Sequence, residues 1–561
     1  MRKKRILFVT EFSALNSGFA VYGKNLITAL FDKDKYEIAS LAAYCKPGDS
    51  RIWDLPWKVF PVIPHPSDQE ATAIYNSNRA NQFGAACFDK VALEWKADIV
   101  IDWRDPWYFS YQPNSPYRRF FKHIVMPAID SYPQRDEWMD IYKRVDRVLT
   151  YSHFGKEVIE DQSNGSINVA GVAQAGVELD LFKPTEDKRK LREELGIDPN
   201  LKIVSFVSRN QMRKLFPDFL ETMGIFVEKY KDKNPELAKN LVFYLHTSYP
   251  DNGWDIPECI MRSGYSHKVM MTYVCSKCGH VFASYFSGMQ ARCRRCKQMT
   301  AILPNINCGV SREHLAKIMQ CADLAVQLAT AGGQEMAIAE FKACGVPVIA
   351  PPYSAMEEQV VDIGNEERRH RGGIPVKIER FFTEQQSMLY RCLFSREDLA
   401  DKIYDTLTMP KKEHDTLCRE ARECAEEIYN WKNSIETWEK IIDEIEVDPV
   451  GETWESPISI IKPKADQAPH TNSAEEFVDW CHDNFLNNDD IITDYQKSRM
   501  VLSLKAGYNV DKKKPDEKVT PEGMIERFRG IMNLKNESER YRDVVLNGSK
   551  KVNNFKIEII S

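Results

Sequence analysis

The stretch at residues 322–350 constrains the fold more than any other part of the chain. Two apolar runs, 322–328 and 346–350, flank a Gly-Gly turn at 332–333 and a helical pattern that ends at Gly345. Glycine favours a helix C-terminus, and buried strands of a parallel sheet are near-continuous apolar runs. The stretch therefore predicts a strand–helix–strand unit of an α/β fold. The turn that opens the helix could hold a phosphate or sugar oxygen, or it could be an ordinary tight turn.

A second junction of this kind lies near the N-terminus. The apolar run Ile6–Thr10 predicts a buried strand, and a turn at Ser17-Gly18 precedes a helical pattern that begins near Phe19. A glycine at this point would let a ligand approach the backbone closely. The turn lacks the full GxGxxG fingerprint, so it is weak evidence for a dinucleotide site and also suits a plain turn.

Charged and aromatic residues follow three buried strands in the first half of the chain. Ligands of open α/β sheets bind beyond the carboxyl ends of the strands, so these residues predict the wall of a site. The strand at 97–101 leads into Asp102, Trp103, Arg104, Asp105 and Trp107, and two later strands lead to Asp130 and His153. An Arg–Asp pair that locks a loop is the alternative at 102–105, and a lone histidine after a strand also suits a structural role.

A basic turn follows the predicted strand at 201–207. Arg209, Arg213 and Lys214 occupy this turn, before an amphipathic helical pattern at 216–230. Arg binds oxyanions through a fork of donors and Lys binds them as a point charge, so three cations at a strand-to-helix junction suit a diphosphate. A solvated basic turn is the alternative.

Four cysteines form the strongest local motif. Cys275 and Cys278 make one CxxC pair, and after fourteen residues Cys293 and Cys296 make another. Two such pairs can place four thiolates around one Zn²⁺, which closes the coordination shell and predicts a structural zinc ribbon. The other cysteines are scattered singly, which suits a reducing, cytoplasmic compartment better than a disulfide framework.

The residues around these cysteine pairs are strongly basic. No Asp or Glu occurs from Cys259 to Arg312, and Phe282, Tyr285 and Phe286 lie between the two pairs. Cations interleaved with aromatic rings suit a nucleic-acid surface, whereas a ribbon that supports a loop beside the sheet is equally consistent. The basic residues of this span are Arg262, Lys268, Lys277, Arg292, Arg294, Arg295, Lys297 and Arg312.

Length and charge narrow the classes of function. A chain of 561 residues exceeds one hydrophobic core, so several domains are expected. The net charge of −6 and the pI of about 6.1 give no general attraction to nucleic acid or to an anionic membrane. No apolar run approaches the roughly 20 residues of a membrane span.

Taken in their order along the chain, the motifs resemble those of GT-B glycosyltransferases of family 4, which are retaining enzymes with nucleotide-sugar donors. The resemblance covers roughly residues 5–446 and implies an α/β fold of two Rossmann-like domains that face a central cleft. It implies that the helix opened by Trp431 crosses back to the first domain. The motifs that carry it are Ser17-Gly18, Gly176-Val177-Glu178 with Phe182-Lys183-Pro184, Arg209, Lys214, Glu340 and Trp431.

The resemblance also implies a role for each motif. Arg209 and Lys214 would hold the donor diphosphate, and Glu340 would bind the donor ribose. The family's first glutamate falls at Gly332, so Glu335 is the nearest carboxylate to the donor sugar. The residues expected to bind the donor are Gly18, Arg209, Lys214, Gly333, Gln334, Glu335, Met336 and Glu340, of which Arg209, Lys214 and Glu335 are expected to be catalytic. The residues expected to bind the acceptor are Asp102, Arg104, Asp105, Asp130 and His153.

The acceptor, and catalysis itself, stay open on the sequence alone. The acceptor is a carbohydrate or lipid-linked glycan, or a hydroxymethylated base in DNA as in phage DNA glycosyltransferases, with the basic ribbon holding the strand. The glycine at 332 also allows a non-catalytic scaffold that binds sugar nucleotides. The predicted organisation is an acceptor domain at 1–195, a donor domain at 196–425 with the zinc ribbon at 272–300, a returning helix at 426–446, a linker at 447–472 and a helical appendage at 473–561.

Overall fold

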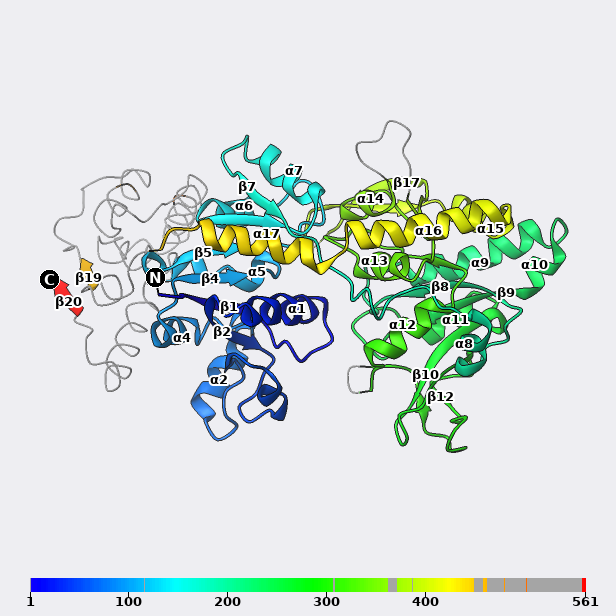
Figure 1. Cartoon of the computed structure of the whole chain (residues 1–561), viewed down its shortest axis with the longest axis horizontal. Coiled ribbons are helices and arrows are strands. Elements are labelled where there is room, and N and C mark those ends of the chain that lie inside the picture. The colour runs from blue at the N-terminus through cyan, green and yellow to red at the C-terminus, as the bar shows by residue number, and fades with distance from the viewer. Residues whose placement is uncertain are drawn as a thin grey trace, which may run out of the picture.

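The computed structural model describes residues 2–447 except 116, 306–307, 362–370 and 386, together with Ile458–Ile461, Asp479, Val501 and Ile557–Ile560. Residues 2–447 form two α/β lobes that lie side by side, each built on its own sheet (Figure 1). The predicted linker at 447–472 and appendage at 473–561 otherwise lie outside the described residues. None of the described helices is both long and apolar enough to cross a bilayer.

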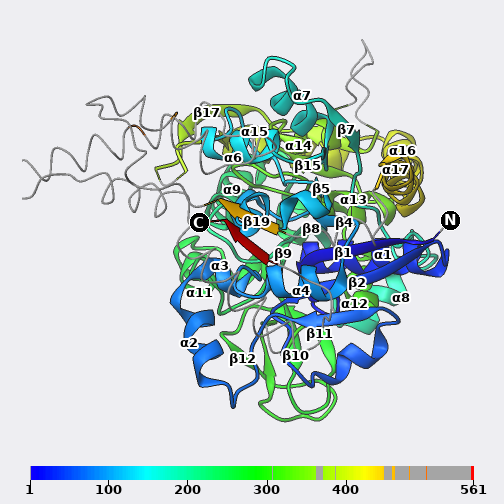
Figure 2. The same cartoon turned by 90° about the vertical axis from the view of Figure 1, so that its left-hand side faces the viewer.

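The first sheet has seven parallel strands in the order β3-β2-β1-β4-β5-β6-β7. The central run Ile6–Val9 is fully buried, because helices cover both faces of the sheet (Figure 2). All carboxyl ends of a parallel sheet lie at one edge, so the loops that follow them can build one site. The strands are β1 (Lys4–Glu11), β2 (Tyr36–Ala43), β3 (Lys58–Pro61), β4 (Ile99–Asp102), β5 (Lys122–Val125), β6 (Arg147–Thr150) and β7 (Val169–Val172).

The second sheet has a parallel body and an antiparallel extension. Its order is β12-β13-β10-β9-β8-β14-β15-β16, with β11 also paired to β10. Strands β10 to β13 form the extension, which projects on the same side of the molecule as the helix at 69–77 (Figures 1 and 2). The strands are β8 (Lys202–Val207), β9 (Leu241–His246), β10 (Val269–Cys275), β11 (Val281–Tyr285), β12 (Gln290–Ala291), β13 (Ala301–Ile302), β14 (Leu324–Val326), β15 (Val348–Ala350) and β16 (Gly373–Pro375).

In the described part of the chain, seventeen α-helices surround these sheets, and two strand pairs lie apart from them. The helices are α1 (Gly18–Asp32), α2 (Gln69–Ser77), α3 (Arg79–Gln82), α4 (Phe88–Trp95), α5 (Pro106–Phe109), α6 (Asp136–Lys143), α7 (His153–Gln162), α8 (Lys188–Leu195), α9 (Phe216–Tyr230), α10 (Pro235–Asn240), α11 (Ile256–Arg262), α12 (Arg312–Gln320), α13 (Met336–Ala343), α14 (Ala355–Val360), α15 (Arg396–Thr408), α16 (Lys411–Glu427) and α17 (Trp431–Glu444). The strand pairs are β17 (Ile378–Thr383) with β18 (Tyr390–Phe394) and β19 (Ile458–Ile461) with β20 (Ile557–Ile560).

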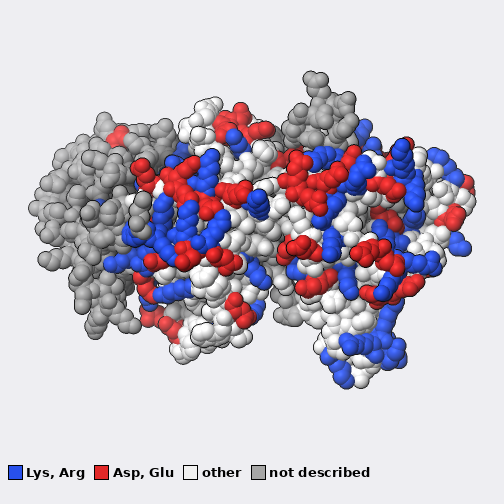
Figure 3. Space-filling view, in the orientation of Figure 1, with Lys and Arg blue, Asp and Glu red and all other residues white. Residues whose placement is uncertain are grey.

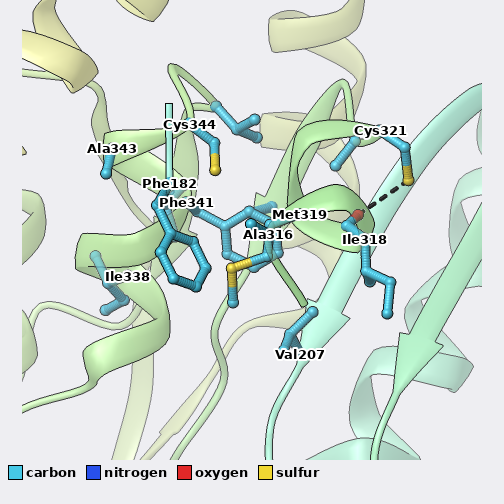
Figure 4. Close-up of a cluster of buried hydrophobic side chains, with 14 of the residues drawn as sticks. Phe182, Val207, Ala316, Ile318, Met319, Cys321, Ile338, Phe341, Ala343 and Cys344 are labelled. Carbon is cyan, nitrogen blue, oxygen red and sulfur yellow. Dashed lines mark hydrogen bonds between the residues drawn. The ribbon is translucent and has the colours of Figure 1, made fainter. Parts of the chain in front are cut away.

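The strand–helix–strand unit predicted at 322–350 is present as β14, α13 and β15. β14 and β15 pair in parallel, and Gly345 adopts the left-handed conformation (φ +69°) that ends the helix. Ile338 and Phe341 of α13 pack with Met319 of α12 in a buried cluster (Figure 4). Burying one such side chain stabilises the fold by about 1.5–3 kcal/mol, so this cluster fixes α13 on the sheet.

The last long helix returns the chain to the first lobe. α16 lies on the second lobe and α17 on the first (Figure 1). The indole of Trp438 donates a hydrogen bond to the hydroxyl of Tyr22 on α1 (2.7 Å), and a Cβ atom on Gly176 would lie 2.5 Å from the backbone nitrogen of Trp431. The chain therefore crosses between the lobes twice at one place, near Gly176 and Trp431.

Candidate active site between the two sheets

Residues predicted to bind a donor lie on loops that meet between the lobes. Gly18 opens α1 after β1, and Met336 opens α13 after β14. A Cβ atom on Gly18 would lie 3.6 Å from the sulfur of Met336, so the two glycine junctions face each other. Ser17 caps α1 by accepting a hydrogen bond from Ala20 N–H and also donates one to Glu11.

The loop at 329–335, which leads into α13, is fixed to the first lobe. The Gln334 side chain accepts a hydrogen bond from Ala175 N–H (2.6 Å) and donates one to Ala175 C=O (3.1 Å). A Cβ atom on Gly333 would lie 3.0 Å from the backbone of Ala128, which explains the glycine at this position. A ligand bound against this loop would therefore touch both lobes.

Arg213, Lys214 and Glu335 form a buried ionic group, called here the Glu335 cluster. Lys214 Nζ lies 2.5 Å from one carboxylate oxygen of Glu335, and Arg213 lies 2.8 Å from the other. Arg213 also donates to Ala331 C=O (2.8 Å), which ties the basic turn to the 329–335 loop. The sequence placed Arg213 in the basic turn but did not single it out for the site, because its partner lies 122 residues away.

The charges of the Glu335 cluster fix its protonation. Burial alone would raise the pKa of Glu335, but Lys214 and Arg213 lower it to about 2. Burial and the neighbouring charge of Arg213 lower the pKa of Lys214 to about 8, against the attraction of Glu335. The cluster therefore carries a net positive charge between these two values and loses it above about pH 8.

The Glu335 side chain occupies the space that a side chain at position 332 would need. A Cβ atom on Gly332 would lie 2.5 Å from a carboxylate oxygen of Glu335. The Glu335 side chain thus folds back over the position where the resembled family carries its first glutamate. A side chain at 332 would clash with the carboxylate oxygen that pairs with Arg213.

Arg209 stands apart from the Glu335 cluster. Its guanidinium forms two hydrogen bonds with Asp251, at 2.9 and 3.1 Å, and the side chain is 54% exposed. Asp251 lies in the loop after β9, and no motif in the sequence singles it out. Asp251 holds Arg209 at the carboxyl end of the second sheet, where an anion could still reach it.

Glu340 is buried on α13 and paired with Arg312. The Arg312 guanidinium donates to Glu340 (2.7 Å), contacts Glu178 of the segment that joins the two lobes, and lies over the ring of Phe182. Burial raises the pKa of Glu340 despite this cation. Arg312 was recognised in the sequence only as a basic residue, since nothing local reveals its two partners.

The prediction that Asp102 and Arg104 bind the acceptor is wrong. Both side chains are fully buried and form an ion pair (2.6 Å), and Gln112 donates to the same carboxylate (2.8 Å). An acceptor cannot reach them, so the alternative of a pair that locks a loop is the right interpretation. Trp103 is also fully buried, whereas Trp107 is 45% exposed.

Asp105 and Asp130 are partly buried, and both lie near Arg213 of the Glu335 cluster. Burial and the nearby charge of Asp130 raise the pKa of Asp105 to about 8, although Arg213 acts in the opposite direction. Asp130 pairs with Arg391 of the second lobe (2.8 Å). The site therefore contains a carboxyl group that is protonated at neutral pH.

His153 opens α7 at the boundary of the lobes. Its side chain is exposed, while its N–H and that of Phe154 donate to a carboxylate oxygen of Glu358 at 2.8 and 3.3 Å. Gln174 donates to the other oxygen of Glu358 (2.9 Å). Glu358 belongs to α14 of the second lobe, so the end of α7 serves as a contact between lobes.

The four predicted metal ligands converge in the extension of the second sheet. The sulfur atoms of Cys275, Cys278, Cys293 and Cys296 all lie within 4.8 Å of one another, with two of the separations at 3.6 and 3.7 Å. A tetrahedral site with Zn–S bonds of about 2.3 Å requires sulfurs about 3.8 Å apart.

The two cysteine pairs are built alike. Gly279 N–H and Lys297 N–H each donate to the carbonyl of the first cysteine (2.9 Å in both), and both residues have positive φ. In each pair the N–H of the second cysteine also points at the first sulfur. The residues thus fit one structural metal ion bound by four thiolates.

Loss of a zinc ion held by these four thiolates should unfold the extension. We expect about one equivalent of zinc per chain, and we expect Cys293→Ser or a strong chelator to abolish it and to lower the unfolding temperature, since metal binding supplies folding free energy. Metal analysis and the thiolate charge-transfer bands of a Co²⁺-substituted sample measure this. Cys259→Ser, outside the cluster, is the matched control and should retain the metal. Full stability without metal would contradict the assignment.

Comparison with solved structures places the fold. Similar structures include a sucrose-phosphate synthase from Thermosynechococcus elongatus (TM-score 0.55, 15% identity over 79% of this chain and 99% of that one). Anabaena HepE, solved with UDP and glucose, gives 0.53 with 14% identity over 79% and 100%, and a glycosyltransferase from Rickettsia africae gives 0.52 with 15% identity over 79% and 99%. No protein-family model matches the sequence, and no curated protein matches it. The chain has the GT-B fold, as predicted.

Proposed function

We propose that the chain is a retaining glycosyltransferase that binds a nucleoside-diphosphate sugar between its lobes and transfers the sugar to a hydroxyl group. The observation that carries the proposal is the Glu335 cluster at the start of α13, between two GT-B lobes. HepE, which shares the fold, is described in complex with UDP and with UDP-glucose. This supports a uridine nucleotide as the first donor to test.

The donor diphosphate would bind at the basic turn and the helix end. Lys214 and Arg209 would stabilise the negative charge that develops on the leaving diphosphate. The Glu335 N–H donates to Gln359, and among the described residues none accepts a hydrogen bond from the N–H groups of Met336 and Ala337. These two donors, at the positive end of α13, would complete the diphosphate site.

Sugar and ribose would be held by the two carboxylates of this segment. Glu335 would contact the sugar hydroxyls from its position over Gly332, and Glu340 would accept hydrogen bonds from the ribose. Gly18 would let the donor lie close to the backbone of the first lobe.

The acceptor would enter from the first lobe, beside Asp105 and Asp130. Because Asp105 is protonated at neutral pH, it would donate a hydrogen bond rather than act as a base. The bond from the anomeric carbon to the diphosphate oxygen breaks, and the acceptor oxygen bonds to the same face. The acceptor proton passes to the leaving diphosphate.

A screen of nucleotide sugars by thermal shift tests donor binding. A donor at about 100 times its Kd should stabilise the folded protein by about 2.7 kcal/mol and raise the unfolding temperature by several degrees. Release of the nucleoside diphosphate then measures turnover. If no nucleotide or nucleotide sugar shifts the transition, the proposal fails. Tight binding without turnover on any acceptor would instead favour a sugar-nucleotide scaffold.

The acceptor could also be a hydroxymethylated base in DNA. Aromatic side chains that follow β4 favour this second candidate. Tyr108 packs on Phe83 (4.0 Å between ring centroids), and the exposed Trp107 packs at a tilt against Trp138 (5.5 Å). Rings of this kind can hold a base outside the helix stack. Mass spectrometry of hydroxymethylated DNA after incubation with each donor would detect the added sugar, and unmodified DNA in every case would reject this acceptor.

A further inference from the structure

The antiparallel extension of the second sheet carries a cluster of exposed cations, called here the ribbon cations. All five are exposed, and none pairs with a described carboxylate, whereas Arg262 and Arg312 at the ends of the acid-free span do. Figure 3 shows Lys and Arg without acidic neighbours on this projection, while both signs are mixed over the lobes. The ribbon cations are Lys277, Arg292, Arg294, Arg295 and Lys297.

The metal site does not neutralise this charge. A Zn²⁺ ion with four thiolates carries a charge of about −2, so the five cations exceed it. The rest of the protein is acidic, with a net charge of −6 for the whole chain. The ribbon is therefore a local positive surface on a negative molecule, which points to a polyanion rather than to general charge attraction.

One exposed ring and two exposed thioethers lie on the same extension, with Tyr285 at its base, where it pairs with Met270 of β10. Tyr285 is 43% exposed, and Met289 and Met299 are 58% and 55% exposed. Soluble proteins seldom expose such side chains together without a partner, and bases can stack on an exposed ring. Three of the five cations are arginines, which bind phosphate oxygens bidentately.

The base of the ribbon adjoins the candidate active site. β10 pairs with β9 as far as Met271 and Leu245, so residues 272–275 extend past the carboxyl end of β9. Tyr249, in the loop that holds Arg209 through Asp251, donates its N–H to Pro304 C=O (2.8 Å). The stem of the ribbon therefore joins the second sheet beside the loop that holds Arg209, while Arg294 contacts Gly196 in the turn before β8.

We propose that the ribbon binds the phosphodiester backbone of a nucleic acid. The binding does not depend on the glycosyltransferase activity proposed above and would hold for a different acceptor. The test uses fluorescence anisotropy of the full-length, zinc-loaded protein with a labelled 20-nucleotide DNA strand, its duplex and the matching RNA. With five phosphate contacts on a single strand, log Kobs should fall with log salt concentration with a slope of about −3.5.

Two matched variants locate the surface. Arg292→Gln, Arg295→Gln and Lys297→Asn remove three ribbon cations, and asparagine tolerates the positive φ of Lys297. Arg294 is kept because it donates to Gly196 C=O (2.9 Å) and anchors the ribbon. The control removes three exposed cations on α8 and α17, each in an ion pair with a glutamate one turn along: Arg189→Gln, Lys432→Gln and Lys440→Gln.

We expect the ribbon variant to bind at least tenfold more weakly at low salt and to reduce the slope by about 2, while the control stays close to wild type. Equal losses in both variants would show that net charge alone acts, and would overturn the proposal. It would also fail if polyglutamate competed as well as unlabelled oligonucleotide, since the partner would then be an acidic protein. If the ribbon variant loses nucleic-acid binding but still hydrolyses the sugar nucleotide, nucleic-acid binding and the proposed glycosyltransferase activity are independent.

Discussion

Lys214→Met should lower kcat/KM for a nucleotide sugar by about 10²–10³-fold, the usual effect of removing one group that stabilises a developing oxyanion. Methionine keeps the length and apolar stem of the side chain, which is only 4% exposed, but removes the charge. The cluster would then hold Arg213 and Glu335 alone, with no net positive charge for the diphosphate. Steady-state kinetics measure the loss, and Lys229→Met, in an exposed ion pair with Asp401, is the control.

The pH profile offers a sharper form of the same test. Lys214 has a pKa of about 8 and has to be protonated to attract the diphosphate, so kcat/KM should be level below this pH and fall tenfold per unit above it. Asp105 titrates in the same range. Lys214→Arg should move the falling limb upward if the lysine is responsible. If the fall in kcat/KM above pH 8 persists in Lys214→Arg but disappears in Asp105→Asn, it arises from titration of the Asp105 carboxyl group.

Glu335→Ala should have the second largest effect, and on stability as well as on rate. It leaves buried Lys214 without its counterion, and breaking a buried ion pair costs about 3–5 kcal/mol. Arg213 is 36% exposed and can be hydrated, which favours the lower end of this range. Thermal unfolding measures the loss. A bound nucleotide should restore part of it, because the diphosphate would replace the missing carboxylate beside Lys214.

Gly332→Ala provides a double-mutant cycle for this pair. Alone, the added methyl group would clash with the Glu335 carboxylate at 2.5 Å and should destabilise the protein. In the Glu335→Ala background the clash is absent, so the second change should cost little. Additive losses in the double variant would show that the two positions do not share one space. Unchanged kinetics in Glu335→Ala would show that this residue does not serve the donor sugar.

Local patterns predicted the fold and the convergence of the four cysteines. The apolar runs at 6–10 and 322–350 and the spacing of four cysteines each lie within a short stretch, and each was confirmed in its strands, its helix or its sulfur cluster. Periodicity and spacing suffice for such features because the partners are close in sequence.

Side-chain pairing over long separations could not be predicted. Asp102 and Arg104 can be buried because Gln112 and the carbonyl of Phe83 hydrogen-bond to them. Neither partner is adjacent in sequence, so the charged residues after β4 were predicted to line the site although they lie in the interior. The Glu335 cluster brings Arg213 and Lys214 to a loop more than 100 residues later. Most of these residues could be predicted as site residues from the sequence, but their pairing in the folded chain could not.

For the proposed reaction, the contacts of Gln334 and Glu358 imply an order of events. Together they make five hydrogen bonds between the lobes. Each contributes about 0.5–1.5 kcal/mol, and a closed state favoured by about 4 kcal/mol leaves roughly one molecule in a thousand open. A nucleotide between the lobes would leave only through that minor population. Separation of the lobes and release of the nucleoside diphosphate would then limit the rate of turnover, and bond cleavage would be faster.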